Sequence, residues 1–463
     1  MNSALNIWHP FTQEALDPPP LRIARAQGAY LYTDDGRRLI DGISSWWVNI
    51  HGHCHPAIVS AIAEQAAKLD HVLLAGFTHD AVEELCVRLR KVLPRGLDHI
   101  FFSDNGSTAV EVALKIAVQY WSNIGRPQKR SIVALEHAYH GDTVGAMSVS
   151  AQSGFTDPFR NLLFPAQWVH SAYCYRCPVG KTRDTCKIDC VERLARLLEQ
   201  KHEEIAAVIV EPLLQGAGGM IVHPVEFLQQ VRRLCSEYDV LLIADEVLTG
   251  FGRTGRMFAC ELAGVVPDLM CLSKGLTGGV LPMGATVCTP QIHQAFVSED
   301  RTRTFYHGHS YTGNPLAAAS AVASLKIFEA EPVFARIKRI GQIHRERLQM
   351  LKSHPAVGDV RSIGVMAAVE LRADDAGYFS KLRPRLYKFF LEAGVLLRPL
   401  GNVIYVLPPY VLSEEDLHFG IMWIAVTIEE PRGRKRQATK VWPAASTNVT
   451  EEGIVLPGPT TAG

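Results

Sequence analysis

The chain has 463 residues, of which 47% are hydrophobic and 20% are charged, an ordinary globular composition. Basic and acidic residues each number 47, so the formal net charge is zero and the totals do not suggest a nucleic-acid-binding protein. No stretch approaches the roughly 20 apolar residues that span a bilayer, and no secretory signal is evident. Ten cysteines in so long a chain do not make a disulfide scaffold, so we expect reduced thiols and a cytoplasmic protein.

Short apolar runs alternate with helix-like stretches up to about residue 330. Strands are predicted at 99–103, 131–135, 207–210, 240–244 and 269–272, and helices at 56–69, 107–120, 191–202 and 224–238. This alternation predicts an α/β fold with a largely parallel sheet covered on both faces. Farther along, an α+β mixture with strands at 365–371 and 403–407 predicts a second, smaller domain. Residues 431–463 lack periodicity and are expected to be a disordered tail.

Two motifs resemble nucleotide-binding sequences, but each lacks a feature that such a site needs. Gly250-Phe-Gly-Arg-Thr-Gly255 matches the dinucleotide fingerprint, but it does not follow a strand directly and Asp268 comes too early to bind a ribose. Gly180-Lys181-Thr182 looks like the end of a P-loop, but Tyr175 stands where that loop needs its first glycine. We therefore expect neither a nicotinamide enzyme nor an NTPase.

Four cysteines, Cys174, Cys177, Cys186 and Cys190, follow the spacing C-x2-C-x8-C-x3-C. Four thiolates could hold a structural zinc ion. The inner spacing is shorter than in common zinc motifs, which favours a cysteine-bearing surface loop, so we expect no metal.

Three other elements fit together as a cofactor site. An apolar strand ends at Asp245, another ends before Lys274, and the polar turn before Ser107 opens a strong helix. In an α/β sheet such strand ends meet at one crevice, where ligands bind. A helix start suits a phosphate, a desolvated lysine is favoured as the free amine that attacks an aldehyde, and a carboxylate can keep a pyridine nitrogen protonated.

Each element also has an ordinary structural explanation: a solvated lysine, an aspartate that caps a helix, and a helix N-cap. The residues alone therefore support a cofactor crevice and leave its occupant open.

Longer motifs carry a family resemblance. Ile243-Ala-Asp245-Glu246-Val247, Thr249-Gly-Phe-Gly-Arg-Thr-Gly255 and Leu272-Ser-Lys274-Gly-Leu-Thr-Gly-Gly279 resemble the class III aminotransferases, as do Glu211-Pro212 and Gly308-His-Ser310-Tyr-Thr-Gly-Asn-Pro315. The resemblance covers roughly residues 7–430. It implies fold type I of the pyridoxal-phosphate enzymes, with a mostly parallel seven-stranded sheet in a large domain (61–330), a smaller α+β domain (331–430), and an N-terminal segment (1–60) that packs with the small domain.

The resemblance also implies the roles of individual residues. Lys274 would bond to pyridoxal 5'-phosphate and shuttle a proton, Asp245 would pair with the ring nitrogen, Gly106 and Ser107 would bind the phosphate, and Val247 and Tyr139 would flank the ring. His309 and Ser310 resemble a phosphate loop from a partner subunit, which implies a homodimer. The substrate pocket would be formed by Phe11, Trp46, Tyr139, Lys274, Gly308 and Arg398.

Within the family, the chain most resembles the biotin-pathway branch, in which an amino group from S-adenosylmethionine is transferred to 8-amino-7-oxononanoate. The supporting residues include Ile7-Trp-His-Pro10, Trp46-Trp47 and Leu397-Arg398-Pro399. Phe11 stands where many such members have tyrosine, and Gly308-His309-Ser310 where they often have Gly-Pro-Thr. Both changes resemble a branch that uses lysine as donor. An ω-amino acid or diamine aminotransferase is a further alternative.

Overall fold

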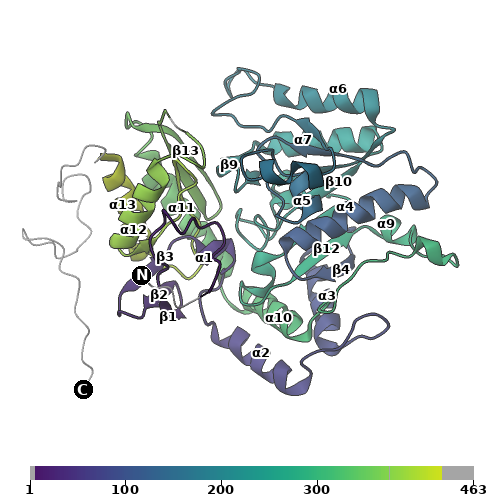
Figure 1. The fold of residues 1–463 in the computed structure, drawn as a ribbon, viewed down its shortest axis with the longest axis horizontal. Coiled ribbons are helices and arrows are strands. Elements are labelled where there is room, and N and C mark those ends of the chain that lie inside the picture. Colours follow the sequence, from purple (N-terminus) through teal and green to yellow (C-terminus); the bar gives the residue numbers. More distant parts are fainter. Residues whose placement is uncertain (1–5, 375, 430–463) are drawn as a thin grey trace, which may run out of the picture.

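The seven-stranded sheet of the larger lobe follows the apolar runs of the sequence (Figure 1). The computed structural model describes residues 6–374 and 376–429. The sheet order is β4 (His99–Ser103), β12 (Gly284–Cys288), β11 (Leu269–Leu272), β10 (Leu241–Asp245), β7 (Ile205–Val210), β5 (Ser131–Leu135) and β6 (Gln167–Val169). Only β12 runs antiparallel to its neighbours, so the predicted mostly parallel α/β sheet is confirmed.

Alternate residues of the central strands enter two separate cores. Ile243 of β10 packs in one core, whereas Leu242 and Ala244 pack in the other. Helix α4 (Gly106–Asn123) buries its apolar face in the first core, and α7 (Val225–Glu237) packs in the second. The sheet is therefore covered on both faces, as the strand–helix alternation predicted.

The predicted elements agree closely with the observed ones. The observed limits lie within one residue of the predicted ones at both ends of three helices, namely α2 (Pro56–Lys68), α6 (Glu192–Lys201) and α7. Strands β6 and β12 were not predicted, because β6 has only three residues and the sequence of β12, which begins with glycine and contains a threonine, gives no continuous apolar run.

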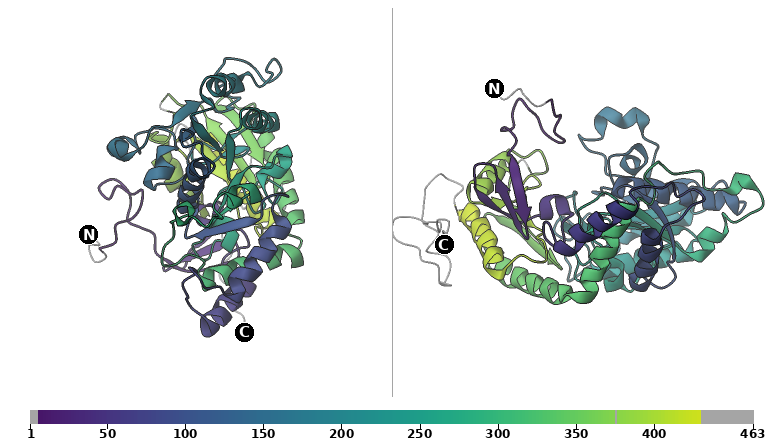
Figure 2. Two further views of the ribbon diagram at one scale, coloured as in Figure 1. Left: turned by 90° about the vertical axis from the view of Figure 1, so that its right-hand side faces the viewer. Right: turned by 90° about the horizontal axis from the view of Figure 1, so that it is seen from below.

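The smaller lobe combines both ends of the described chain (Figures 1 and 2). Strands β1 (Ile23–Gln27), β2 (Tyr30–Thr33) and β3 (Arg38–Asp41) form a sheet with β15 (Val395–Leu396), which is parallel to β3. A second sheet contains β13 (Val357–Ile363), β14 (Met366–Leu371) and β16 (Val403–Val406). Helices α11 (Val333–Gln349), α12 (Leu382–Glu392) and α13 (Glu414–Glu429) complete this α+β arrangement.

Two arginines with largely buried side chains join distant segments. Arg253 is 1% exposed and donates hydrogen bonds to the carbonyl oxygens of Pro408 (2.9 Å) and Trp47 (3.0 Å). Arg361 of β13 donates to the carbonyl oxygens of Gly219 (2.6 Å) and Met220 (2.7 Å). These bonds fix the smaller lobe against the end of the large sheet.

The ten cysteines are all free thiols. Among the described residues, no helix is long and apolar enough to cross a membrane. The tail expected at 431–463 lies outside the described residues.

Candidate active site

A cavity of about 730 Å³ lies where β10 and β11 end and α4 begins. Its wall includes six of the residues predicted for the site, namely Gly106, Ser107, Tyr139, Asp245, Val247 and Lys274. The strand ends and the helix start therefore meet at one crevice, as expected for a parallel sheet.

Lys274 follows β11 and has a positive φ of 41°. A left-handed backbone is uncommon for a lysine, so the packing around it must hold this conformation. Its Nζ lies 5.4 Å from the ring centroid of Trp47. Lys274 is partly exposed, because its side chain lies on the wall of the cavity. Burial lowers the pKa of Lys274, and the carboxylates of Asp245 and Glu211 oppose this shift. The neutral amine is thereby favoured.

Asp245 is held by two hydrogen bonds at the end of β10. Its Oδ1 accepts from the Val247 N–H (3.0 Å), and its Oδ2 lies 2.7 Å from Nδ1 of His140. Asp245 is 4% and His140 3% exposed, so the pair is desolvated. Nε2 of His140 has no hydrogen-bond partner among the described residues. His140 was missed as a site residue, because its spacing from Asp245 in sequence gives no signal of contact.

Glu211 is a second buried carboxyl beside the cavity. It accepts hydrogen bonds from the N–H groups of Tyr139 and Gly216, each at 3.0 Å. Burial raises the pKa of Glu211 to about 7, with His140 opposing the shift. Its motif with Pro212 was recognised only as part of the resemblance, and sequence reasoning gave it no role.

The start of α4 forms the opposite wall. Asn105 caps the helix by accepting from the Thr108 N–H (2.9 Å), while the N–H groups of Gly106 and Ser107 lie in the first turn, where helical acceptors are lacking. A Cβ on residue 106 would lie 2.6 Å from Cγ1 of Val247, so only glycine allows this close approach. Oγ of Ser107 lies 2.7 Å from Oγ1 of Thr143, a further hydroxyl on the cavity wall.

Tyr139 lies on the cavity wall, with its backbone fixed by Glu211. Burial raises the pKa of its hydroxyl, and neighbouring Asp142 adds to the shift. The phenol therefore remains a neutral hydrogen-bonding group.

Phe11, Trp46 and Arg398 form a separate cluster that does not belong to the cavity wall. The Arg398 guanidinium lies 4.4 Å from the Trp46 ring centroid, and the rings of Phe11 and Trp46 are 5.5 Å apart. No ion pair joins Arg398 to an acidic side chain of the described residues. The cluster thus offers an available cation beside exposed aromatic rings.

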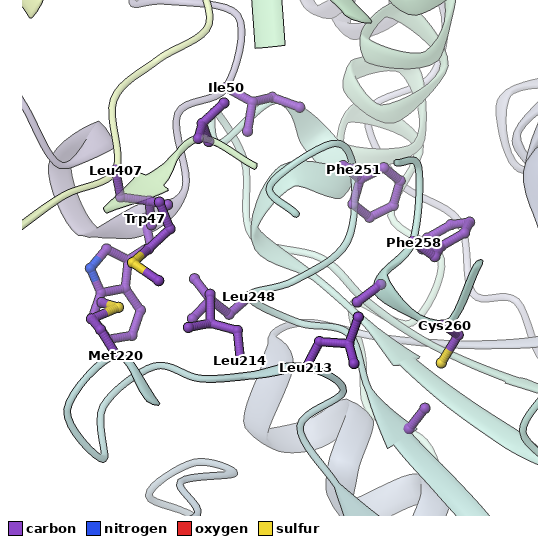
Figure 3. Packing of buried hydrophobic residues seen from close by; sticks show 14 of the residues in the cluster. Trp47, Ile50, Leu213, Leu214, Met220, Leu248, Phe251, Phe258, Cys260 and Leu407 are labelled. Carbon is purple, nitrogen blue, oxygen red and sulfur yellow. The ribbon is translucent and has the colours of Figure 1, made fainter. Parts of the chain in front are cut away.

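Trp47, rather than Trp46, lines the cavity. Its Nε1 donates to the hydroxyl of Tyr405 (2.9 Å), and Figure 3 shows its indole near Met220 and Leu407. The two adjacent tryptophans therefore have different environments, 5% exposed at Trp47 and 41% at Trp46.

Gly308, His309 and Ser310 lie on the segment before α10 (Pro315–Ala330), and none of them belongs to the cavity wall. Nε2 of His309 lies 3.9 Å from Oδ1 of Asp104, which does line the cavity. Gly308 and Ser310 are exposed.

The cavity fits pyridoxal phosphate in its chemistry. It contains the amine of Lys274, whose pKa is lowered by burial, and the buried carboxylate of Asp245, which is hydrogen-bonded to His140. The start of α4 adds N–H groups that have no helical acceptor. In the residues that the structure describes, no group of three or more His, Cys, Asp or Glu side chains has the arrangement of a metal-binding cluster.

Comparison with known proteins agrees with this chemistry. The family model described as aminotransferase class-III matches residues 11–428. The chain belongs to the class III aminotransferases. It is therefore a transaminase, and its cofactor is pyridoxal phosphate, as expected. The fold type is confirmed as well, because the similar solved structures are transaminases.

Individual relatives cover nearly the whole chain. An adenosylmethionine-8-amino-7-oxononanoate aminotransferase from Synechococcus elongatus is 47% identical, covering 93% of this chain and 100% of the relative. A protein of the same name from Geobacter sulfurreducens is 44% identical, with 89% and 93% covered. The crystal structure of the Methanocaldococcus jannaschii protein of that name has a TM-score of 0.86 and 37% identity, with 92% and 97% covered. An amine transaminase from an uncultivated Pseudomonas species also has a TM-score of 0.86, at 33% identity, with 93% and 99% covered.

Proposed function

We propose that this transaminase converts 8-amino-7-oxononanoate to 7,8-diaminononanoate in biotin biosynthesis, with S-adenosylmethionine as amino donor. The observation that carries the proposal is the high identity, over nearly full length, to relatives of that name. The cluster of Arg398 and Trp46 supports it, because the acceptor ends in a carboxylate on an aliphatic chain.

Lys274 moves the proton in the proposed mechanism. Bound pyridoxal phosphate supplies an aldehyde that captures amines and a ring that withdraws electrons from the breaking bond. When its own amine is free, Lys274 accepts the proton from the amine-bearing carbon of the donor, and it later returns a proton as the acceptor's ketone becomes an amine. Its lowered pKa supports both roles, because a base must be neutral before it can accept.

Asp245 and His140 stabilise positive charge at the ring nitrogen of the cofactor. Because His140 donates to Oδ2 and the Val247 N–H to Oδ1, the carboxylate is fixed in place on the cavity wall, where it would accept a hydrogen bond from the ring N–H of the cofactor. Gly106, Ser107 and the start of α4 would bind the phosphate, and Val247 and Tyr139, which line the same cavity, would flank the ring.

Substrates are recognised at the second cluster. Arg398 binds the carboxylate of 8-amino-7-oxononanoate bidentately, and Phe11 and Trp46 contact the rest of the substrate. For Gly308, which lies on the segment before α10, a substrate contact is proposed from the family resemblance alone. The same pocket must admit the donor. The missing hydroxyl at Phe11 favours lysine as the alternative donor, and the likeness to an amine transaminase favours an ω-amino acid or diamine as the next alternative.

We further propose a cytoplasmic homodimer in which His309 and Ser310 of one subunit complete the phosphate site of the other. The exposure of Ser310 supports this arrangement, and ten free thiols fit a reducing compartment. Residues 61–330 are proposed as the cofactor domain and 331–430 as the small domain, with 1–60 packing on the latter. The pairing of β3 with β15 supports this division.

Single-turnover reactions test the function. Purified protein with bound cofactor is mixed separately with S-adenosylmethionine, lysine or β-alanine, and loss of the cofactor's visible absorption is followed. We expect the fastest loss with S-adenosylmethionine, then recovery of the absorption and formation of 7,8-diaminononanoate when 8-amino-7-oxononanoate is added. A fast reaction with β-alanine and no recovery with 8-amino-7-oxononanoate would reject the proposal.

A further inference from the structure

The four cysteines of the C-x2-C-x8-C-x3-C pattern lie on one long loop. The loop joins β6 to the short helix η2 (Asp189–Val191) and α6, at the top of Figure 1. None of its residues lines the active-site cavity, so the transaminase reaction gives these thiols no role.

The fold brings all four cysteines around one small cavity. Cys174, Cys177, Cys186 and Cys190 all line a single cavity of about 20 Å³. A space of about 10–15 Å³ holds one water molecule, so this cavity has room for a single small occupant. The short inner spacing, which had favoured a loop without metal, does not keep the cysteines apart, because the chain turns back around the cavity.

We propose that these four thiols bind one zinc ion as a tetrahedral tetrathiolate. Zinc is the metal that four cysteine ligands most commonly hold in a structural site. The sulfur atoms are not arranged as a metal-binding cluster among the described residues, so they move inward to about 2.3 Å from the ion when it binds. Cys174 is exposed, and Cys177 and Cys186 are half-buried, so three of the four side chains have room to turn.

A backbone N–H and two cationic residues also lie around the cavity. The N–H of Lys181 donates to Sγ of Cys177 (3.3 Å), and Lys181 and Arg183 are among the residues that line the same cavity. Both cations have carboxylate partners, Lys181 with Asp189 (2.6 Å) and Arg183 with Glu226 (2.7 Å). A zinc tetrathiolate carries two negative charges; because both cations are already paired, the direct contact that would stabilise it is the N–H of Lys181 at Sγ of Cys177.

The site would fasten the loop to the smaller lobe. Tyr173 donates its hydroxyl to Oε2 of Glu370 (2.5 Å), and Arg176 pairs with Oε1 of the same carboxylate (2.5 Å). Glu370 lies on β14 and is 4% exposed in its side chain. Because Cys174 and Cys177 bracket Arg176, a bound metal holds the residues that contact the small lobe.

The first experiment is metal analysis of the full-length protein with its cofactor, purified without chelator. We expect about one zinc ion per chain. Cys174→Ser and Cys186→Ser should lose that zinc, whereas Cys54→Ser, at an exposed cysteine elsewhere, should keep it. Cofactor absorbance of each variant shows whether it folds, and loss of zinc should lower the Tm while leaving cofactor binding unchanged.

A second measurement does not depend on the variants folding. Wild-type protein stripped of zinc should take up one Co²⁺ per chain and show the intense absorption of tetrahedral thiolate coordination. Absence of both zinc and Co²⁺ uptake would overturn the proposal, as would equal metal content in Cys174→Ser. Intact mass of the unreduced protein showing two disulfides would overturn it too. None of these outcomes depends on which amino donor the enzyme uses, so they stay separate from the proposed reaction.

Discussion

The active-site cavity and the Arg398 cluster differ in how their charged side chains are buried and paired. In the cavity, charged side chains are buried and bonded to one another, as Asp245 is to His140. In the cluster, Arg398 stacks on Trp46, which is 41% exposed. Arg398 itself has no acidic partner among the described residues. The first arrangement fixes geometry for chemistry, and the second leaves a cation ready for a ligand. Substitutions in the first should therefore change the rate, and in the second should change substrate binding.

Lys274→Ala is the largest expected effect. The turnover number should fall by about 10⁴-fold or more, because both the positioned base and the covalent attachment point are lost. Steady-state rates and the visible spectrum measure this. Lys129→Met is the matched control, since Lys129 is also buried, with its pKa lowered to about 8 mainly by burial, but donates to the His202 carbonyl and lies outside the cavity wall. Equal losses in both variants would contradict a special role for Lys274.

Asp245→Asn should lower turnover by roughly 10²-fold, because a neutral amide no longer balances positive charge on the cofactor ring. Its neighbour provides the contrast. Glu246 accepts from Thr249 Oγ1 (2.5 Å) and from the N–H groups of Ala259 (3.0 Å) and Cys260 (2.8 Å), and it does not line the cavity. Glu246→Gln should lower Tm yet leave turnover per folded molecule unchanged. A larger loss of turnover in Glu246→Gln than in Asp245→Asn would show that Glu246, and not Asp245, is the carboxylate that acts on the cofactor.

Arg398→Lys should raise KM for 8-amino-7-oxononanoate about tenfold, with little change in kcat, because lysine cannot form the bidentate pair with a carboxylate. Arg25→Lys is the control, since Arg25 also stacks on an aromatic ring, that of Tyr32 at 3.5 Å, on strand β1. A fall in kcat without a change in KM would show that Arg398 acts in the chemical step and not in substrate binding.

The pKa of Lys274 offers a finer measurement in protein stripped of cofactor. Only the neutral amine attacks the aldehyde, so the rate of pyridoxal phosphate attachment should rise through a midpoint below the ordinary 10.5. Asp245 raises the pKa of Lys274 through its charge, so Asp245→Asn should move the midpoint to lower pH. Asp35→Asn, on an exposed turn, should leave the midpoint where it is. An upward shift in Asp245→Asn would show that the two groups do not interact in this way.

Phe11→Tyr is the smallest expected change. The added hydroxyl should improve the reaction with S-adenosylmethionine relative to lysine by a few-fold, on the order of one hydrogen bond. The ratio of the two single-turnover rates measures it. If the ratio is unchanged, Phe11 does not contribute to the choice of donor.

The sequence determined five of the seven strands of the large sheet, the limits of helices α2, α6 and α7 to within one residue, and the chemical types at the cavity, because these depend on local periodicity and on the residue types next to each strand end. Strands β4, β5 and β11 have the predicted limits, and Asp245 and Lys274 meet as expected. Tertiary structure alone decided that His140 backs Asp245, that Trp47 rather than Trp46 lines the cavity, and that four loop cysteines share one space. Contacts between residues far apart in the chain depend on how the layers pack, and no local pattern records that packing.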